Sequence, residues 1–581
     1  MYLAWIPRTL LLLGCLPWVP LAAQQATVTE ASLLEQLERD SKDLGAYTRL
    51  YQVYLKQGRP ADAEKLFQRA VGAIPPSVFA PDRPQALAVG DFYLVFGKTD
   101  QALQQYRAGM ADNPGDKLTY LKRQIETLLR QGKRSEAGEL NAQILRESPN
   151  DNDARLLAAS LLLDKGDVNG ALAELEALAV RAPENPVTHF TLGRAYVARG
   201  DWEAAKRAFN KAIELRPDYL PARLALAQVQ VTRGEFDDAW KTAGAALALD
   251  GGNQNARLIQ SAALLGQKKV AEARQMLEEM LKADPASADA NFQLGVVSLT
   301  EKKYPEAATA FRRAYQLNPA NSNALMGMVE AAMALNQADT AIALLQAEAD
   351  KAPNRADLQL ALGNTALRAA RYDLAIATFQ KLLDQMEKGS ASQGDLYVRL
   401  GETYRRKGDN PAAIQALEKA RQTLPNNALV SGALAMALDS AGRRTEAGEA
   451  YEATLKLDPN NAMAMNNYAY LLADTGGDLG RSLALAHRAR QLLPNVAEIS
   501  DTLGWVYVKM SMADNAIETF RGLVDRDPDR PTYRYHLAMA YQLKGDTAAA
   551  LREARAAADR HPSEPERRQI QALLAQLGGG K

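Results

Sequence analysis

The sequence is poor in the side chains that build reactive centres. Its 581 residues include one cysteine, Cys15, and four histidines, which excludes an internal disulfide and a cysteine-ligated metal centre. No histidine pairs with another at metal-ligand spacing, and neither a serine nucleophile elbow nor an HExxH motif occurs. We therefore expect a chain that is not an enzyme and that holds no metal and no cofactor.

The sequence also lacks an excess of charge of either sign. Lysine plus arginine total 69 and aspartate plus glutamate total 69, which leaves a net charge of +0 at pH 7. This balance offers no general attraction for nucleic acid or for an anionic membrane. With 47% hydrophobic and 24% charged residues, the composition is that of an ordinary folded protein, and the length favours several domains or a repeat array.

The first residues have the order of a secretory signal. One basic residue, Arg8, precedes an apolar run at 10–19, and the segment ends on small residues at Ala22 and Ala23. This pattern predicts a signal peptide at 1–23, with cleavage between Ala23 and Gln24 and a secreted or periplasmic mature protein. The run is too short for a comfortable membrane span.

Cys15 leaves an alternative open at the same segment. Leu12-Leu13-Gly14-Cys15 resembles the lipobox of bacterial lipoproteins, whose cysteine is lipidated after cleavage. The competing prediction is therefore a lipoprotein that is anchored through Cys15. Cleavage after Ala23 would instead remove the only cysteine from the mature chain.

A period of 34 or 35 residues runs through the rest of the chain. It is marked by prolines at matching positions, with Gly251 in the place of one of them: Pro114, Pro149, Pro183, Pro217, Pro285, Pro319, Pro353, Pro425, Pro459, Pro494, Pro528 and Pro562. Twelve residues before most of these prolines stands an alanine, and twelve before that a glycine or alanine. Self-similarity at this period is the signature of a repeat architecture.

Residues 186–219 show what one repeat encodes. Gly193 and Ala205 are small enough for two short helices to pass closely, Phe209 fills the space toward the next repeat, and Pro217 ends the second helix. Helices this short are marginal alone, so each repeat buries its apolar face against its neighbours.

These columns resemble the tetratricopeptide repeat. In 186–219 the matching residues are Leu192, Gly193, Tyr196, Ala205, Phe209, Ala212 and Pro217, with His189 where the family usually has tryptophan. The resemblance implies an all-α fold, a right-handed superhelical solenoid of about fifteen helix-turn-helix units with a C-terminal capping helix. It also implies that the first helices of the units line a concave groove.

The period predicts the following domain organisation. After the signal peptide, a lead or cap segment spans 24–43, and an array of about ten units spans 44–387. The Gly/Ser-rich stretch 388–395 is either a flexible joint or a longer turn. A second array of about five units spans 394–564, and 565–581 form the capping helix and tail.

Two sets of groove positions are candidates for binding a polypeptide. The first is an apolar stripe in which packing is the competing interpretation, formed by Leu156, Phe190, Leu224, Leu258, Phe292, Met326, Leu360 and Val398. The second, which we call the aromatic patch, is formed by Asn466, Tyr470, Asp501, Trp505, Tyr535 and Met539. The carboxylate clamp of chaperone-binding members is not matched, because Glu126 stands where that clamp has asparagine.

The last units add a narrower resemblance. The segment containing LGWVYV and YRYHLAMAY is similar to exported bacterial repeat proteins of the exosortase and exopolysaccharide-associated type. We therefore expect an exported scaffold that binds a protein or peptide in its groove, within a bacterial envelope assembly or an export system for exopolysaccharide or surface proteins. The alternatives are a polysaccharide-binding module, in which Tyr470, Trp505 and Tyr535 stack on sugars, and a lipoprotein adaptor of outer-membrane or pilus assembly.

Overall fold

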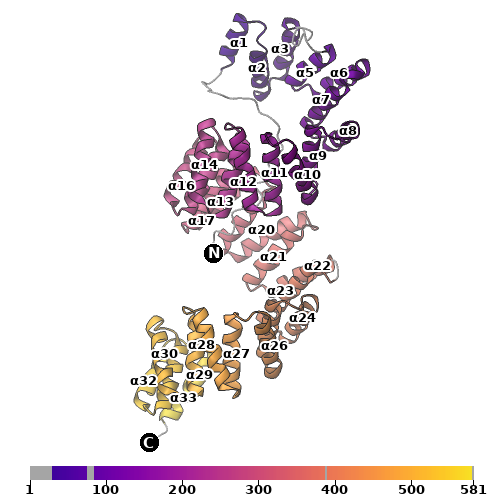
Figure 1. Cartoon of the computed structure of the whole chain (residues 1–581). Coiled ribbons are helices and arrows are strands. Elements are labelled where there is room, and N and C mark those ends of the chain that lie inside the picture. The colour runs from indigo at the N-terminus through magenta and orange to yellow at the C-terminus, as the bar shows by residue number, and fades with distance from the viewer. Residues whose placement is uncertain (1–28, 75–83, 387–388, 579–581) are drawn as a thin grey trace. The chain divides into compact units, whose positions relative to one another are not determined.

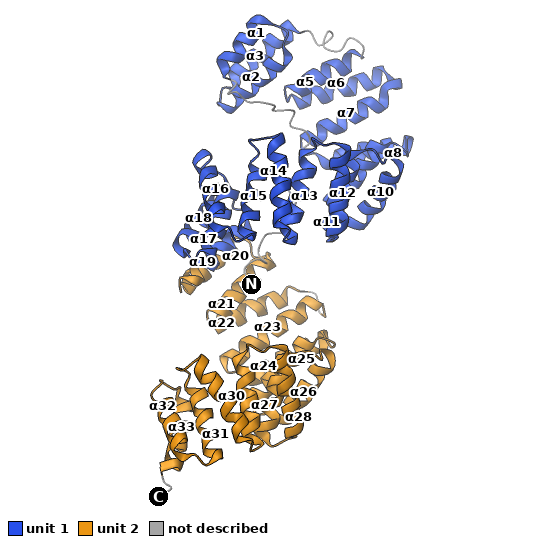
Figure 2. Cartoon of the chain, turned by 60° about the vertical axis from the view of Figure 1, so that its left-hand side comes forward, with its two compact units in different colours: residues 1–331 blue, residues 332–581 orange. Residues whose placement is uncertain are grey.

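The structure is a computed structural model that describes residues 29–74, 84–386 and 389–578. Within these ranges every regular element is a helix, which confirms the all-α prediction. The chain divides into two compact units, residues 1–331 and 332–581, each a row of packed helices (Figures 1 and 2). The predicted signal peptide and Cys15 lie outside the described residues.

Unit 1 begins with a single helix and continues as helical hairpins. Its helices are α1 (Glu30–Arg39), α2 (Leu44–Lys56), α3 (Pro60–Ala73), α5 (Gln85–Val95), α6 (Thr99–Asp112), α7 (Lys117–Arg130), α8 (Arg134–Glu147), α9 (Asn152–Asp164), α10 (Val168–Arg181), α11 (Pro186–Arg199), α12 (Trp202–Leu215), α13 (Leu220–Arg233), α14 (Phe236–Leu249), α15 (Gln254–Gly266), α16 (Val270–Ala283), α17 (Ala288–Thr300) and α18 (Tyr304–Leu317). A short 3-10 helix, η3 (Pro114–Asp116), precedes α7.

Helix α19 (Ser322–Ala334) includes the last residues of unit 1 and the first of unit 2. Unit 2 continues with α20 (Ala338–Lys351), α21 (Ala356–Arg368), α22 (Tyr372–Asp384), α23 (Ala391–Lys407), α24 (Asn410–Thr423), α25 (Ala428–Ser440), α26 (Arg444–Leu457), α27 (Ala462–Thr475), α28 (Leu479–Leu492), α29 (Ala497–Lys509), α30 (Ala513–Arg526), α31 (Pro531–Lys544), α32 (Thr547–Ala558) and α33 (Glu564–Gly578). Over the described residues, the helices between α1 and α33 pair into the expected fifteen hairpins.

The ends of the helices follow from the local sequence. Asn185 caps α11, because its side-chain oxygen accepts from the backbone N–H groups of Val187 and Thr188. Gly200 ends α11 with φ of 84°, a left-handed conformation that glycine adopts without a Cβ penalty. Asp201 then caps α12 by accepting from the N–H of Ala204. Side-chain caps at Asn185 and Asp201 and a left-handed glycine at Gly200 therefore set these helix ends.

The small residues of the period lie where one helix meets a ring. A Cβ added at Gly193 would come within 2.5 Å of the Phe209 ring, and one at Gly504 within 2.6 Å of the Phe520 ring. Both phenylalanine side chains are fully buried. Phe209 also packs with Leu226 of the following hairpin, so it joins two consecutive repeats as the sequence predicted.

Both ends of the described array are closed by a helix. In α1, Leu33 and Leu37 are buried in the cluster that contains Tyr47. In α33, Ile570, Leu573 and Leu577 are buried, whereas the arginine and glutamine side chains of the helix are exposed. The predicted C-terminal capping helix is confirmed, and a polar outer face is what the last element of such an array requires.

The Gly/Ser-rich stretch 388–395 is largely helical from residue 391. Ser390 caps α23, because its hydroxyl accepts from the N–H of Gln393, and Gly394 packs against Leu424. Residues 391–395 of the predicted joint or longer turn are therefore helical, since a cap and a tertiary contact outweigh the flexible composition. One hydrophobic cluster also joins Phe379 before this stretch to Leu396 after it. The division into two arrays here stays a prediction.

The described residues offer no helix that is both long and apolar enough to cross a membrane. In the same ranges, His, Cys, Asp and Glu side chains form no group of three or more that would hold a metal ion.

Candidate protein-binding surface

The apolar stripe lies half-buried within the hairpins. Leu258 and Phe292 are buried, and Leu156, Phe190, Leu224, Met326, Leu360 and Val398 are of intermediate exposure. The Phe190 ring lies 5.9 Å from the ring of Phe209 and 5.4 Å from that of Tyr219. Phe292 lies 5.6 Å from Phe311 in the same way. The stripe thus supplies packing area to the hairpins, and only part of each side chain remains for a ligand.

The first helices near the start of unit 1 carry charged side chains that are paired with each other. The hydroxyl of Tyr106 donates to Asp91 Oδ1 over 2.7 Å, and Arg123 Nε lies 3.2 Å from the same oxygen. Arg123 also donates to Glu126, which accepts from Arg130 as well. Burial and the Asp91 carboxylate raise the pKa of Tyr106 far above its usual range.

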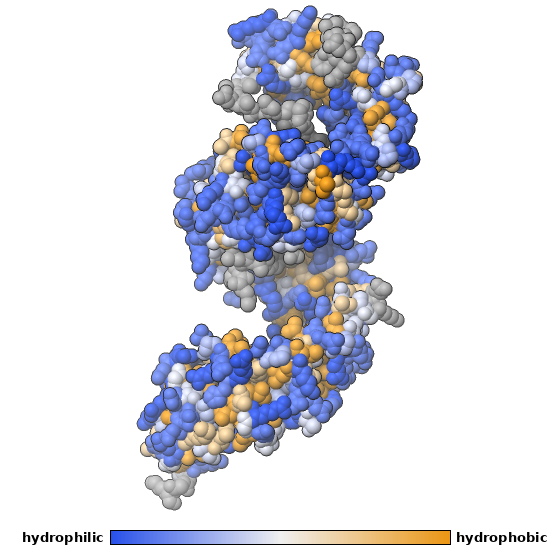
Figure 3. Space-filling model, viewed as in Figure 1, coloured by the Kyte–Doolittle hydropathy of each residue, from blue (hydrophilic) through white to orange (hydrophobic). Residues whose placement is uncertain are grey.

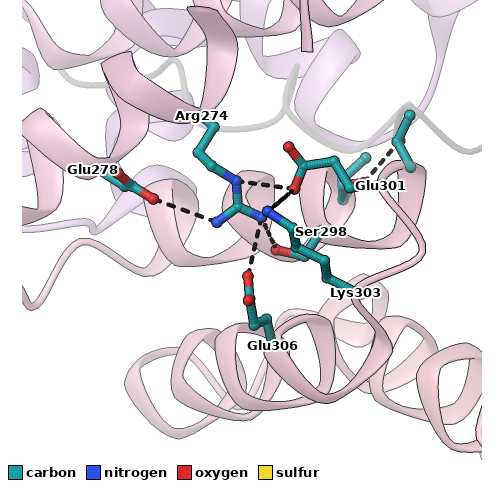
Figure 4. Close-up of polar contacts among 8 residues, drawn as sticks. Arg274, Glu278, Ser298, Glu301, Lys303 and Glu306 are labelled. Atoms are coloured by element: carbon teal, nitrogen blue, oxygen red, sulfur yellow. Dashed lines mark hydrogen bonds and ion pairs between the residues drawn. The ribbon is translucent and has the colours of Figure 1, made fainter. Parts of the chain in front are cut away.

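A second paired network ties consecutive hairpins together further along unit 1. Arg274 of α16 donates through Nε to Glu301 over 3.0 Å, and its other nitrogens contact Ser298, Glu278 and Glu306 (Figure 4). The hydrogen bond from Arg274 holds the pKa of Glu301 below its usual value. Such networks rigidify the stack but leave few groups to recognise a partner.

The aromatic patch of unit 2 has a different character. It lies on α27, α29 and α31, the first helices of consecutive hairpins, which contact one another. Hydrophobic residues run across the face of unit 2 on which α27 to α29 lie (Figure 3). Tyr470 of α27 is 40% exposed, whereas Asn466 on the same helix is only 6% exposed. Asn466 donates to the side chain of Asn467 over 3.1 Å.

The remaining members of the aromatic patch gather around a histidine. His536 Nδ1 lies 2.8 Å from Asp501 Oδ1, so the imidazole is oriented by the carboxylate. The His536 ring lies 5.3 Å from Trp505 and 5.6 Å from Tyr535. Trp505, Tyr535 and Met539 are partly buried against the core cluster of the last hairpins. The structure therefore brings Asp501, Trp505 and Tyr535 together through a residue that the sequence did not indicate.

His536 is not among the candidate residues that the sequence indicated. No spacing rule marks it, because its partner Asp501 belongs to the previous repeat, 35 residues away. The one available signal was positional, since the histidine follows Tyr535 directly and Asp501 occupies the equivalent of position 535 in the preceding unit.

Comparisons with known proteins agree with this architecture. Models of the tetratricopeptide repeat family match residues 128–187, 162–212, 196–263, 258–322, 298–363, 354–426, 433–497 and 502–565. The matches cover more than half of the sequence and fall on the helical hairpins. The chain belongs to the tetratricopeptide repeat family, and its repeats form a protein–protein interaction scaffold.

Curated relatives share only parts of the chain. It is 29% identical over 169 residues to a cellulose synthase operon protein C of Pseudomonas fluorescens, a match over 28% of this chain and 13% of that protein. It is 24% identical over 175 residues to a TPR repeat-containing protein of Pseudomonas aeruginosa, over 29% and 28% of the two chains. It is 34% identical over 102 residues to a probable magnetosome protein of Magnetospirillum gryphiswaldense, over 17% and 22%. The matched region therefore spans less than a third of each relative.

Among solved structures, the chain is similar to one chain in the crystal structure of an APC/C hetero-tetramer. The sequence identity is 16% and the TM-score is 0.41, with 87% of this chain and 99% of that chain covered.

Proposed function

We propose that the chain is an exported, non-catalytic scaffold that binds a polypeptide on its first helices within a bacterial envelope assembly. The observation that carries the proposal is the aromatic patch, in which exposed Tyr470 lies on α27, Trp505 on the adjoining α29, and Tyr535 on α31, which adjoins α29. Aromatic side chains at the centre of a surface are the usual anchors of protein interfaces. The signal-like residues 1–23 support export, with cleavage before Gln24 or lipidation of Cys15 as the two routes.

One relative supports an exopolysaccharide setting, because it is named as a protein of a cellulose synthase operon. Direct sugar binding is the less favoured alternative, because stacking on sugars needs open ring faces. Lys509 lies over the Trp505 ring at 4.9 Å, and His536 contacts both Trp505 and Tyr535. A polypeptide can instead engage the side chains from their edges.

Site-specific photo-crosslinking in the native envelope tests the proposal. A photoreactive residue at Tyr470 is expected to crosslink to one protein partner, whereas the same residue at exposed Glu518 of α30 is the matched control. Crosslinks at Glu518 but not at Tyr470 would contradict binding at the aromatic patch. N-terminal sequencing of the same material checks export, since we expect Gln24 as the first residue.

A further inference from the structure

Two of the most exposed large apolar side chains of unit 2 lie on the helix that carries Tyr470 and on the first helix before it. Leu429 is 73% exposed and Met463 is 46% exposed. Each is the second residue of its helix, in α25 and in α27, and these two helices contact one another. Equivalent positions of adjoining first helices share one face. With Tyr470 they give the first helices α25 and α27 three exposed large apolar side chains.

Three carboxylates from three helices place negative charge near Tyr470. Burial raises the pKa of Tyr470, and the negative charges of Asp474, Asp501 and Asp439 raise it further, while Arg444 opposes them. Asp439 belongs to α25, Asp474 to α27 and Asp501 to α29. We call these three carboxylates, with Leu429, Met463, Asn466 and Tyr470, the Tyr470 surface.

Two basic side chains, Arg444 and Lys509, stand beside these three carboxylates, and Asp501 is also held by the His536 ring at 2.8 Å. Arg444 is shared, at 3.1 Å from Asp439 and 3.7 Å from Asp474, and Lys509 stands 4.0 Å from Asp474. Burial and the charge of Asp474 raise the pKa of Asp439 in spite of Arg444. The surface therefore retains an attraction for a further cation, although the chain as a whole has a net charge of +0.

Lys509 shows which kind of cation this environment accepts. Its ammonium group lies over the ring of Trp505 at 4.9 Å from the centroid, and it also faces the carboxylate of Asp474. An aromatic face beside a carboxylate is a favourable site for lysine and arginine, because cation–π attraction adds to the ion pair. A basic side chain of a partner would find the same combination at Tyr470.

Asn466 provides an independent sign of a missing partner. It is 6% exposed, lies one turn before Tyr470 on α27, and its Oδ1 accepts no hydrogen bond within the described residues. A buried acceptor without a donor costs about 1–3 kcal/mol. The N–H of a bound main chain would supply that donor after a small rotation of the amide.

We propose that the Tyr470 surface binds a peptide segment in which a lysine or arginine is flanked by large aliphatic residues. The basic side chain pairs with Asp439, Asp474 and Asp501, the aliphatic side chains cover Leu429 and Met463, and the peptide backbone reaches Asn466. An acidic ligand is repelled by the same carboxylates. The inference rests on the proposed function and names the chemistry of its partner.

Fluorescence anisotropy with two labelled peptides tests this chemistry on the full chain. One probe of about twelve residues alternates leucine with arginine, and its counterpart alternates leucine with glutamate. We expect the arginine probe to bind at least about tenfold more tightly, with an affinity that falls as salt rises. Asp439→Asn with Asp474→Asn is expected to weaken the arginine probe about tenfold, and Leu429→Ser to weaken it several-fold.

The matched control is Asp525→Asn, which removes an exposed carboxylate from α30 on the other helix of a hairpin. Thermal melts of each variant show that the fold persists. Equal binding of the glutamate probe, or an unchanged affinity in the double variant, would overturn the inference. If the photo-crosslink at Tyr470 forms but the probes show no preference for arginine, the scaffold proposal stands and only the ligand chemistry fails. If the probes show the arginine preference but Tyr470 forms no crosslink, the ligand chemistry stands and the proposal of an envelope partner at Tyr470 fails.

Discussion

Units 1 and 2 share one hairpin core but present different first-helix faces. Phe209 in unit 1 and Phe520 in unit 2 are both fully buried against a glycine of the preceding helix. On the exposed side, Arg123 of unit 1 is paired with Asp91 and Glu126, whereas Tyr470 of unit 2 is 40% exposed. Stacking and recognition therefore use different positions of the same repeat, so the face can change its chemistry without a change in the fold.

The largest effect is expected where the two units are alike. Phe209→Ala and Phe520→Ala each remove a fully buried ring, so each should cost about 3–5 kcal/mol of stability. Because the hairpins are coupled to their neighbours, the loss should be concentrated around the altered hairpin. Hydrogen exchange read by mass spectrometry locates it. A uniform loss of protection along the whole chain would contradict an array of locally stable units.

The next largest effect is expected from removing one basic side chain from each first-helix face, because the cost in stability should differ between unit 1 and unit 2. Arg123→Leu leaves the mostly buried Asp91 without its arginine, which should destabilise unit 1 by about 1–3 kcal/mol. Lys509→Ala in unit 2 removes a partly exposed ion pair at 4.0 Å and should cost less than about 1 kcal/mol. Chemical denaturation of both variants checks the contrast. Similar losses of stability in the two variants would mean that the charged side chains of the unit 2 face are paired as strongly as those of unit 1.

The repeat core was predictable because its signals lie within one period of the sequence. Gly193, Ala205 and Phe209 mark a close helix pair without any knowledge of the neighbours, and the period of 34 or 35 residues predicts about fifteen hairpins over the length of the chain. The helical start of α23 was not predictable, because it depends on the Ser390 cap and on the contact of Gly394 with Leu424. Those interactions outweigh a composition that is typical of a linker.

The candidate site was predictable only in outline. Residue types and helical register placed Tyr470, Trp505 and Tyr535 on one face, and adjoining helices do carry them. Register does not report burial, however, so Asn466 was expected on the open face and is 6% exposed. The pairing of Asp501 with His536, and the placement of Lys509 over Trp505, depend on side-chain conformations across repeats.

A smaller effect should depend on pH in unit 1. The hydrogen bond from Arg274 lowers the pKa of Glu301 in the folded chain, so this pair adds stability above the ordinary pKa of 4.5 and loses it as the pH falls through the lowered value. Arg274→Met should therefore cost roughly 1 kcal/mol at neutral pH and progressively less as the pH falls through the lowered pKa of Glu301. Melting temperatures across that range measure it, with Arg312→Met, an exposed arginine of α18, as the control. A cost that is independent of pH would indicate lost packing instead.

The smallest effect, of opposite sign, is expected at the Tyr470 surface. Burial and Asp474 raise the pKa of Asp439 above its ordinary value of 3.8, so the folded chain binds this proton more tightly than the unfolded chain does. The carboxyl therefore destabilises the fold progressively as the pH rises through that window. Asp439→Asn removes the penalty and should gain up to about 0.5 kcal/mol at neutral pH relative to wild type, and nothing at low pH. Denaturation curves at both pH values, with Asp525→Asn as the control, measure the difference.

Asp439→Asn separates a binding role from a structural one because stability and affinity should move in opposite directions. A carboxylate that serves the fold loses stability when it is neutralised, whereas one that serves a basic ligand loses affinity for that ligand. Unit 1 offers the reference case, since neutralising Asp91 removes the negative charge that pairs with Arg123 and strengthens the hydrogen bond from Tyr106, and it should lower stability. If Asp439→Asn lowered stability as well, Asp439 would be a structural partner of Arg444, and the face of unit 2 would resemble the self-paired face of unit 1.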